Sequence, residues 1–389
     1  MMMTKYHNIS LVRCENYDYE QVKDALRKSI EHLGGFGAYL KKGEKVLLKP
    51  NLVMKKSPAE MATTHPAVIK ALCELLTEFG IHVIIGDSPG GPFNERMLSG
   101  IYKATGMEEV ASETGVRLNY NFNSSELKNP EGLLLKKITI TDMINDVDKI
   151  ISVSKLKTHG MMTFTGAVKN MFGIIPGILK AEYHLIMSKK DDFANALIDI
   201  CIAAEPVLSF MDGIVGMEGA GPTAGDPRAV NVVIASGSPY HLDKVACEII
   251  SLPFDDVSTI KNCIGRGICA EGLSDINLIG DNIESFKIKD FNVPKVKDYA
   301  SPAGGPKILR KFINFMLRPV PAFNLKTCTA CGICADRCPA KIITIKKAKP
   351  VLAASECIRC YCCHELCPSK AIVIKEALVS RLLFRWGKK

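Results

Sequence analysis

The sequence predicts an α/β protein with a largely parallel β-sheet covered by helices, followed by a small C-terminal α+β domain. From about residue 44 to 292, short apolar runs rich in β-branched residues alternate with helical patterns. The runs are apolar throughout, which is typical of parallel strands buried on both faces. After residue 292 the composition changes, and nine of the 15 Cys lie between 328 and 367.

Five apolar runs are predicted to be strands, at residues 44–50, 81–85, 148–159, 207–216 and 230–239. Helices are predicted between them, at residues 64–80, 191–204 and 240–252. In the first helix we expect Thr64 to be the N-cap, Pro66 to lie in the first turn and Gly80 to end the helix. This alternation of strand and helix predicts the parallel sheet.

The overall composition is that of a globular protein of two or more domains: 389 residues, 47% hydrophobic and 23% charged. The first residues, MMMTKYHNIS, lack the apolar core of a signal peptide, and no apolar run reaches the ~18 residues that span a bilayer. No basic stripe with interleaved aromatic residues predicts nucleic-acid binding. The cysteines are spaced for metal binding, so we expect a reducing, cytoplasmic location.

The strongest signal is an internal repeat of C-x2-C-x2-C-x3-C-P. Its copies read "CTACGICADRCPAKIITI" at 328–345 and "CIRCYCCHELCPSKAIVI" at 357–374. This is the spacing of bacterial ferredoxins with two [4Fe–4S] clusters, in which the fourth Cys of each run binds the other cluster. Zinc knuckles use pairs of Cys, and a disulfide framework would not repeat this spacing. The predicted ligands are Cys328, Cys331, Cys334 and Cys367 for one cluster, and Cys357, Cys360, Cys363 and Cys338 for the other.

The remaining cysteines have no ligand spacing. Cys362 is interpreted as a free structural thiol beside a ligand, and the six cysteines before residue 300 as buried small side chains. The formal charge of the chain is +9. Two oxidised clusters with their thiolates add about −2 each, which leaves roughly +5 and suits acidic small molecules.

Four predicted regions follow. We expect an α/β domain at 1–300, a linker and amphipathic connector helix at 301–322, a ferredoxin-like domain at 323–376 and a basic amphipathic tail at 377–389. The tail is interpreted as a helix that docks on protein, with contact to an anionic membrane surface as a secondary alternative.

Polar residues gather near the carboxyl ends of four predicted strands. In open α/β sheets this edge is where ligands bind. The residues are Lys49 and Asn51, Asp87 and Ser88, Lys155 to His159, and Asp212 to Glu218. Lysines that converge at one edge would form a positive pocket for carboxylate or phosphate, and crowding would lower their pKa values. We therefore predict an anion-binding site there.

Roles in this site follow from the chemistry of the side chains. Lys155, His159 and Lys169 are the candidate catalytic residues, because lysine with a lowered pKa and histidine transfer protons near neutral pH. The candidate substrate-binding residues are Lys49, Asn51, Asp87, Lys157, Asn170 and Asp212.

Two alternatives stay open within this site. Asp87 and Asp212 either bind a metal or a substrate hydroxyl, or cap the turns that follow them. Lys169 and Asn170 either face the ligand or lie on a helix and cap its carbonyls. The glycine-rich segment 216–228 is not followed by G-K-[ST], so it is no phosphate loop, and no G-x-S-x-G predicts a serine hydrolase.

Several segments carry a family resemblance. "LLKPNLV" (47–53), "GDSPGG" (86–91), "SKLKTHGMMTFTGAVKNMFGIIPG" (154–177) and "DGIVGMEGAGPTAGDPR" (212–228), followed by a dicluster module, resemble the domain-of-unknown-function family 362 (DUF362). The resemblance covers nearly the whole chain. It implies an α/β domain joined to ferredoxin modules, with an activity that is not established.

A second, local resemblance concerns residues 158–177, which are similar to a segment of nickel-pincer lactate racemases. That resemblance implies a catalytic role for His159 and a Lys169 that tethers a nicotinate-derived cofactor. The sequence departs from the racemase pattern at Ala167 and Val168, where the racemases have Gly-Gly. His65 and His184 are the available second histidines. Nickel or another unidentified ligand in the α/β domain is thus a further hypothesis.

Two functions are consistent with these observations. The first is a cytoplasmic iron–sulfur oxidoreductase of anaerobic metabolism, which exchanges electrons between its clusters and an anionic organic substrate or cofactor at the sheet edge. The second is a noncatalytic electron carrier whose α/β domain docks a redox partner protein. The sequence leaves open whether the chain is an enzyme.

Overall fold

The computed structural model describes residues 8–294 and 319–375. It divides into two compact units. The first contains residues 8–180 and 189–293, and the second contains 181–188, 294 and 319–375. Most of the predicted linker and connector helix, and the predicted tail, lie outside the described residues.

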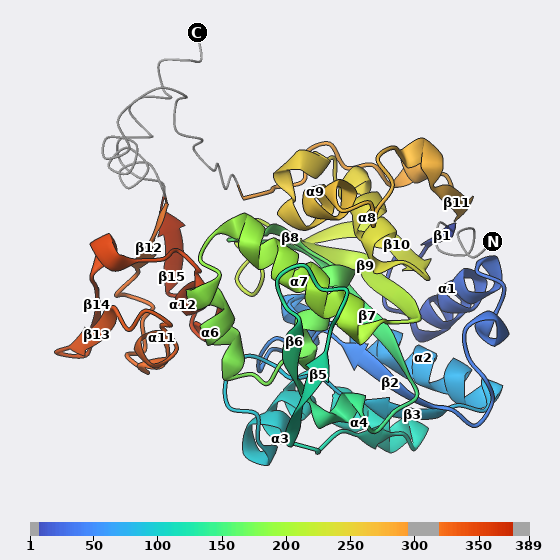
Figure 1. Ribbon diagram of the computed structural model, residues 1–389, viewed down its shortest axis with the longest axis horizontal. Helices are drawn as coiled ribbons and strands as arrows, with labels where there is room; N and C mark the ends of the chain where they lie inside the picture. Colours follow the sequence, from blue (N-terminus) through green and yellow to red (C-terminus); the bar gives the residue numbers. More distant parts are fainter. Residues whose placement is uncertain (1–7, 295–318, 376–389) are drawn as a thin grey trace, which may run out of the picture. The chain divides into compact units, whose positions relative to one another are not determined.

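The first unit contains a mixed, mostly parallel sheet in the order β11-β1-β10-β9-β7-β2-β3-β4 (Figure 1). The central strands pair in parallel, while β10 runs antiparallel to both of its neighbours. This confirms the predicted α/β fold. The strands are β1 (Asn8–Arg13), β2 (Lys45–Pro50), β3 (His82–Ile85), β4 (Arg117–Leu118), β7 (Lys149–His159), β9 (Leu208–Glu218), β10 (Asp226–Ser236) and β11 (Asn277–Gly280). In addition, β8 (Thr163–Thr165) pairs with β7, and β5 (Ser124–Lys128) forms a hairpin with β6 (Lys137–Thr141).

Helices cover both faces of this sheet. One apolar cluster joins strand residues to α1 (Tyr19–His32), α2 (Pro66–Phe79), α3 (Glu95–Ala104) and α4 (Met107–Thr114). A second cluster joins strand residues to α5 (Ala167–Asn170), α8 (Pro239–Ile249) and α9 (Ser258–Gly265). The remaining helices of this region are α6 (Leu179–Ile186), which extends into the second unit, and α7 (Lys190–Ala204). Within the described residues, no helix is long and apolar enough to cross a membrane.

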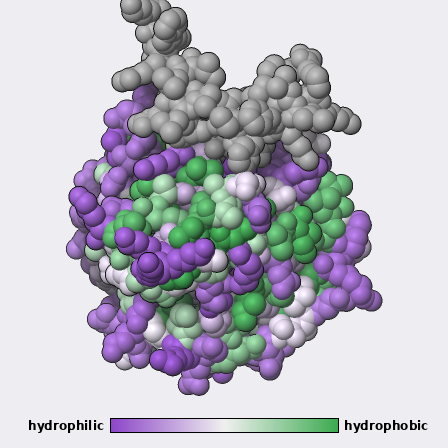
Figure 2. All heavy atoms as spheres, turned by 90° about the vertical axis from the view of Figure 1, so that its left-hand side faces the viewer, coloured by the Kyte–Doolittle hydropathy of each residue, from purple (hydrophilic) through white to green (hydrophobic). Residues whose placement is uncertain are grey.

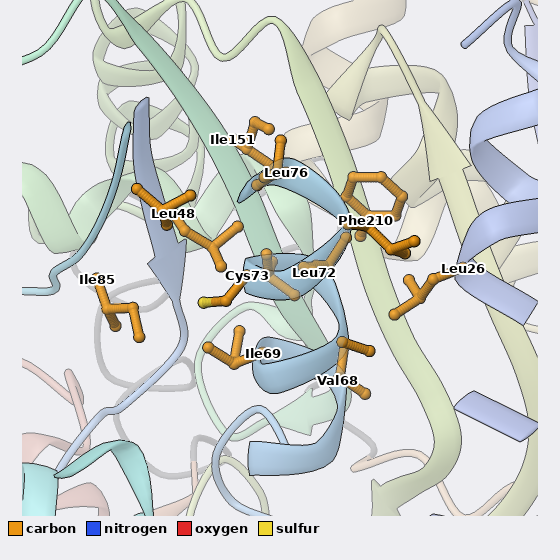
Figure 3. Packing of buried hydrophobic residues seen from close by; sticks show 14 of the residues in the cluster. Leu26, Leu48, Val68, Ile69, Leu72, Cys73, Leu76, Ile85, Ile151 and Phe210 are labelled. Atoms are coloured by element: carbon orange, nitrogen blue, oxygen red, sulfur yellow. The ribbon is translucent and has the colours of Figure 1, made fainter. Parts of the chain in front are cut away.

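Helix α2 shows how the apolar pattern packs onto the sheet. Val68, Leu72 and Leu76 recur at helical spacing and are fully or almost fully buried. They pack toward strand residues that include Ile151 and Phe210 (Figure 3). The apolar face of α2 thus fixes this helix against the central strands.

The N-cap of α2 is His65, which corrects the predicted Thr64. The Nδ1 atom of His65 accepts a hydrogen bond of 3.2 Å from the Ala67 amide. The Thr64 hydroxyl is used elsewhere, because it donates to the Val153 carbonyl at 2.7 Å and accepts from the Asn51 amide at 2.9 Å. This position therefore ties the start of α2 to two strands.

Asp212 does not cap a turn, which is one of the two alternatives for it. It lies within β9, inside the strand predicted at 207–216, and pairs in register with Lys155 of β7. The glycines that suggest a turn lie inside β9, where neighbouring strands leave little room. At Gly216, for example, a Cβ atom would come 3.0 Å from Leu156 Cδ2. β9 consequently continues to Glu218, and the turn to β10 begins only at Gly219.

The second unit is a small α+β structure, as predicted. It contains two antiparallel pairs, β12 (Val320–Phe323) with β15 (Ile372–Lys375) and β13 (Ile343–Lys346) with β14 (Lys349–Leu352). The short helices α11 (Ile333–Asp336) and α12 (Cys362–Glu365) lie within the two copies of the cysteine repeat. Apolar residues of both copies form one shared core.

The two copies also repeat in backbone conformation. Positions 29 residues apart share a positive φ in three cases: Ala330 with Arg359, Gly332 with Tyr361, and Lys341 with Lys370. Only one of these residues is glycine, and the left-handed region is disfavoured for the others. The cysteine-bearing loops therefore hold a specific shape against local strain.

Candidate functional site

The eight predicted cluster ligands line two separate cavities of the second unit. Cavity I is lined by Cys328, Cys331, Cys334 and Cys367 together with apolar residues of β12–β15 and β13–β14. Cavity II is lined by Cys338, Cys357, Cys360 and Cys363. Each cavity thus has three cysteines from one copy of the repeat and the fourth from the other copy.

The residues present fit iron–sulfur clusters. Thiolates are the ligands that such clusters use, and each cavity brings four of them to one apolar hollow. The Ala371 amide donates a hydrogen bond of 3.3 Å to Cys367 Sγ, which is the kind of contact that influences a cluster's potential. Cys362 is buried beside its neighbours but does not line cavity II.

At the sheet edge of the first unit, three of the four predicted lysines, Lys49, Lys155 and Lys157, are buried and already bonded. Lys49 is 0% exposed, and its Nζ lies 2.7 Å from Asp87 Oδ1 and 3.2 Å from Asn170 Oδ1. Asn170 Nδ2 in turn donates to the Ser152 hydroxyl at 3.0 Å. At Gly173 a Cβ atom would overlap both charged groups of the Lys49–Asp87 pair, so only glycine fits there. We call Lys49, Asp87, Asn170 and Ser152 the Lys49 group.

A second buried ion pair lies on the opposite face of the sheet. Lys155 Nζ is 2.8 Å from Asp212 Oδ2 and 2.6 Å from the Tyr17 hydroxyl, which donates to Asp212 Oδ1 at 2.8 Å. The His65 amide donates to Asp212 Oδ2 at 3.0 Å, and the His65 ring stacks on Tyr17 with centroids 3.7 Å apart. We call Lys155, Asp212, Tyr17 and His65 the Lys155 group.

Alternation along the strands explains why the two groups face opposite ways. In β7, Ile151 and Val153 belong to the cluster with α1 and α2, and Lys155 follows at the next position on that side. In β2, Leu48 belongs to the same cluster, so Lys49 points to the other side. The two ion pairs therefore lie on either side of the sheet edge.

Lys157 and Asn51 join the two faces. Lys157 Nζ donates to Asn51 Oδ1 and to the Ala62 carbonyl, each at 2.6 Å. Asn51 Nδ2 donates to Asn170 Oδ1 at 3.2 Å, which reaches the Lys49 group. On the other side, the segment from Ala62 leads directly to His65 of the Lys155 group.

The other two predicted catalytic residues lie at different depths. His159, the last residue of β7, is 1% exposed, and its Nδ1 accepts hydrogen bonds from the amides of Met161 and Met162. Lys169 lies on α5 and is half-buried, with its Nζ 5.9 Å from the centroid of the Phe172 ring. The structure therefore joins five of the nine predicted residues in one bonded network: Lys49, Asp87, Asn170, Asn51 and Lys157. Lys155 and Asp212 form the second ion pair across the edge. Of the last two, His159 is buried and Lys169 is half-buried.

Burial changes the proton affinities of these groups. It lowers the pKa of Lys49 and of Lys155, against the pull of Asp87 and Asp212 respectively. The positive charge of Lys169 lowers the pKa of Lys49 further. Burial also lowers the pKa of His65 to about 4, so this imidazole is neutral at pH 7. With Nδ1 accepting from Ala67, neutral His65 carries its proton on Nε2.

Tyr17, His65 and Ser152 are the members of this site that the sequence does not predict. Ser152 lies within a predicted strand, where its residue type gives no signal. Tyr17 precedes α1 and follows no motif, so no sequence signal could have identified it. His65 was considered only as a second histidine in the nickel-pincer resemblance. Its position directly before Pro66, at the helix start beside the strand ends, is the signal that could have placed it.

The comparisons with known proteins agree with this division of the chain. Residues 46–248 match the family described as domain of unknown function (DUF362), and residues 321–368 match a 4Fe-4S dicluster domain. The chain belongs to the DUF362 family. It is 34% identical over 251 residues to a thylakoid-associated protein from Synechocystis sp., a match that covers 63% of this chain and 75% of that protein.

Two solved structures are similar to this chain over part of their length. The lactate racemase apoprotein from Thermoanaerobacterium thermosaccharolyticum has 13% identity and a TM-score of 0.37, covering 60% of this chain and 56% of that one. A structural-genomics protein from Thermotoga maritima has 17% identity and a TM-score of 0.38, covering 61% of this chain and 60% of that one. The chain thus spans less than two thirds of either solved protein.

The buried Lys155–Asp212 pair leads to a stability prediction. Lys155→Met leaves a buried carboxylate without its counter-charge, so we expect it to lower the free energy of unfolding by ~3–5 kcal/mol. The double variant Lys155→Met/Asp212→Asn should recover much of this loss. Lys23→Met is the control, because its pair with Glu74 is partly exposed and contributes under ~1 kcal/mol. Urea unfolding gives the free energy of unfolding of the wild type and of the three variants. A value for Lys155→Met within about 1 kcal/mol of the wild-type value would contradict the prediction.

Asp243 leads to a prediction about pH. Its buried carboxylate accepts hydrogen bonds from the amides of Ala167 and Val168 at the start of α5, and burial raises its pKa to about 7. Because the folded state holds the proton more tightly than the unfolded state, this group makes the protein less stable as pH rises through about 7. Between pH 6 and 8, the free energy of unfolding of the wild type should fall by about 1 kcal/mol more than that of Asp243→Asn.

The measurement is the difference in urea unfolding between wild type and Asp243→Asn at several pH values. Taking the difference removes the contribution of His65, whose lowered pKa acts in the opposite direction below pH 6.5. A difference that stays constant from pH 6 to 8 would show that Asp243 does not titrate in this range.

Proposed function

We propose that this protein is an iron–sulfur electron-transfer protein that binds two [4Fe–4S] clusters, one in each four-cysteine cavity. The observation that carries the proposal is the crossed arrangement of the two cavities, each lined by three cysteines of one repeat and one of the other. The match to a dicluster domain supports it. Such clusters, when bound, accept and release single electrons.

The chain's own residues would hold the clusters and tune them. Eight thiolates complete both ligand sets, so neither cluster has a free coordination position for a substrate. The amide of Ala371 would stabilise negative charge on Cys367 in the reduced state. Electrons therefore need an acceptor elsewhere, either on a partner protein or in the first unit.

We propose further that the sheet edge of the first unit binds an anionic organic substrate or cofactor, which makes the protein an oxidoreductase. The nine predicted residues include four lysines and two aspartates, a formal excess of two positive charges with His159 neutral. The half-buried members, Asn51 and Lys169, can reach a ligand without breaking a buried ion pair. A reducing cytoplasm would suit both the clusters and the free cysteines.

Iron content tests the clusters directly. Anaerobically purified protein should hold about eight Fe per chain, and Cys367→Ser should reduce this to about four by removing a ligand from cavity I. Cys362→Ser is the matched control and should keep all eight, because Cys362 does not line cavity II. Elemental analysis and native mass spectrometry provide the readout, and nickel or extra mass would reveal a further ligand. Wild-type protein with far fewer Fe would overturn the proposal.

Substrate-dependent reoxidation tests the sheet edge. Dithionite-reduced protein is mixed with a panel of carboxylates and organic phosphates, and cluster absorbance is followed. We expect at least one compound to reoxidise the clusters, and Lys169→Gln to lower the rate at least tenfold while the clusters stay intact. Lys103→Gln, an exposed lysine of α3, is the control. If no compound reoxidises the clusters but a protein acceptor does, the chain is a noncatalytic carrier.

A further inference from the structure

The two cysteine cavities differ in their exposure to solvent. In cavity I, Cys331 is exposed and the other three cysteines are half-buried. In cavity II, three cysteines are buried and only Cys357 is half-buried. Because electron transfer between proteins slows steeply with distance, cavity I is the better point of contact for an external partner.

The hairpin β13–β14 covers both cavities with one of its sides. Ile345 and Pro350, which pair across the hairpin, line cavity I. The pair Ile343 and Leu352 lines cavity II. By strand alternation, the outer side carries Lys346, Lys349 and Val351.

This outer side and its tip are strongly basic. Lys346 and Lys349 stand directly opposite each other, and Lys347 occupies the tip between them. All three are exposed, and within the part of the chain that the structure describes no carboxylate pairs with them. Val351 (44% exposed) lies on the same outer side. Ile345, which lines cavity I from the inner side, is 39% exposed at the hairpin's edge of that cavity. Figure 2 looks onto the side of Figure 1 that carries the labels β13 and β14, and hydrophobic residues lie between hydrophilic ones on that face.

The hairpin keeps these lysines at a cost to its own stability. Like charges directly opposite each other in a β-pair are destabilising. The tip residues Lys347 and Ala348 both have positive φ, 47° and 60°, a conformation for which two-residue hairpins normally use Asn or Gly. Within the described residues, no ion pair with a carboxylate offsets the first cost. An external partner of opposite charge would offset the first.

We infer that the outer side of β13–β14, with its tip, is the docking surface for an acidic redox partner protein that exchanges electrons through cavity I. An apolar centre within a charged rim is the usual composition of a protein interface. Complementary charge accelerates the association of such partners and makes it depend on salt. The described residues 319–375 carry nine Lys and Arg against three Asp and Glu, and two bound clusters would leave a net charge of about +2. The positive charge that favours an acidic partner is therefore the local cluster of three exposed lysines on the hairpin. This inference rests on the proposed electron transfer.

Charge reversal of the hairpin tests the inference. The holoprotein is reduced with dithionite, which needs no docking, and electron transfer is timed to an acidic flavodoxin and to basic cytochrome c as probes. At low ionic strength, Lys346→Glu/Lys347→Glu/Lys349→Glu should slow transfer to flavodoxin at least tenfold and accelerate transfer to cytochrome c. Added salt should slow the wild-type reaction with flavodoxin. It should also reduce the difference in rate between the wild type and the hairpin variant.

The control carries the same change of net charge on the first unit: Lys41→Glu/Lys103→Glu/Lys128→Glu, three exposed lysines. It should transfer electrons to flavodoxin within threefold of the wild-type rate. Iron content shows whether each variant keeps both clusters. If the Lys→Glu variant of the hairpin loses a cluster, a variant with Lys346, Lys347 and Lys349 changed to Gln is tested in its place.

Equal flavodoxin rates for wild type and the hairpin variant would overturn the inference, as would an equal loss in the control variant. If the hairpin variant loses binding to anionic vesicles that the wild type shows, and its rate with flavodoxin is unchanged, the hairpin binds a membrane surface. That result would also overturn the inference. Failure of the electron-transfer function itself has a different signature, namely clusters that dithionite reduces but that pass electrons to neither probe.

Discussion

The sheet edge of this protein depends on the high cost of burying ammonium groups. Lys49, Lys155 and Lys157 are at most 1% exposed, so each must replace water with carboxylate, amide or carbonyl oxygens of the chain. Those oxygens come from segments far away in the sequence, such as Asp87 for Lys49 and Asp212 for Lys155. Each lysine thus connects its strand to a loop or to a second strand through a side-chain contact. Because desolvation offsets most of the attraction in a buried ion pair, this network contributes more to the specificity of the arrangement than to stability.

That constraint also determines which groups at the edge are available for chemistry. A lysine that already has a carboxylate partner can bind a substrate only by giving up that partner. Its charge nevertheless acts through the low-dielectric interior and raises the potential at the edge. In the proposed function, the buried lysines would attract an anion without contacting it, and direct contact would be left to half-buried side chains such as Asn51, His65 and Lys169. Neutral His65, with its proton on Nε2, is suited to donate a hydrogen bond there.

The sequence was sufficient to predict the strand that carries these residues, because apolar side chains before Lys155 and alternation after it are local signals. The partners were not predictable, since they depend on the register between strands. Asp212 illustrates this: its neighbouring glycines suggest a turn, but they lie in β9 because adjacent strands exclude a side chain. Thr64 looks like a helix cap by type, yet its hydroxyl bonds Val153 across the strand ends. By contrast, the cysteine spacing is entirely local, and the grouping of the eight cysteines in two cavities matches what it predicts.

The cysteine repeat shows how one backbone shape can serve two different tasks. Equivalent residues of the two copies adopt the same left-handed conformation, but Gly332 of the first copy corresponds to Tyr361 of the second. Tyr361 is 7% exposed, lines cavity II and donates a hydrogen bond of 2.9 Å to the Pro319 carbonyl, so its ring shields that cavity. Glycine at the equivalent position of cavity I provides no such shield. Since solvent exposure is one of the factors that set a cluster's reduction potential, clusters bound in the two cavities would differ in potential as well as in access. The proposed electron path would then have one open end and one closed end within a symmetric fold.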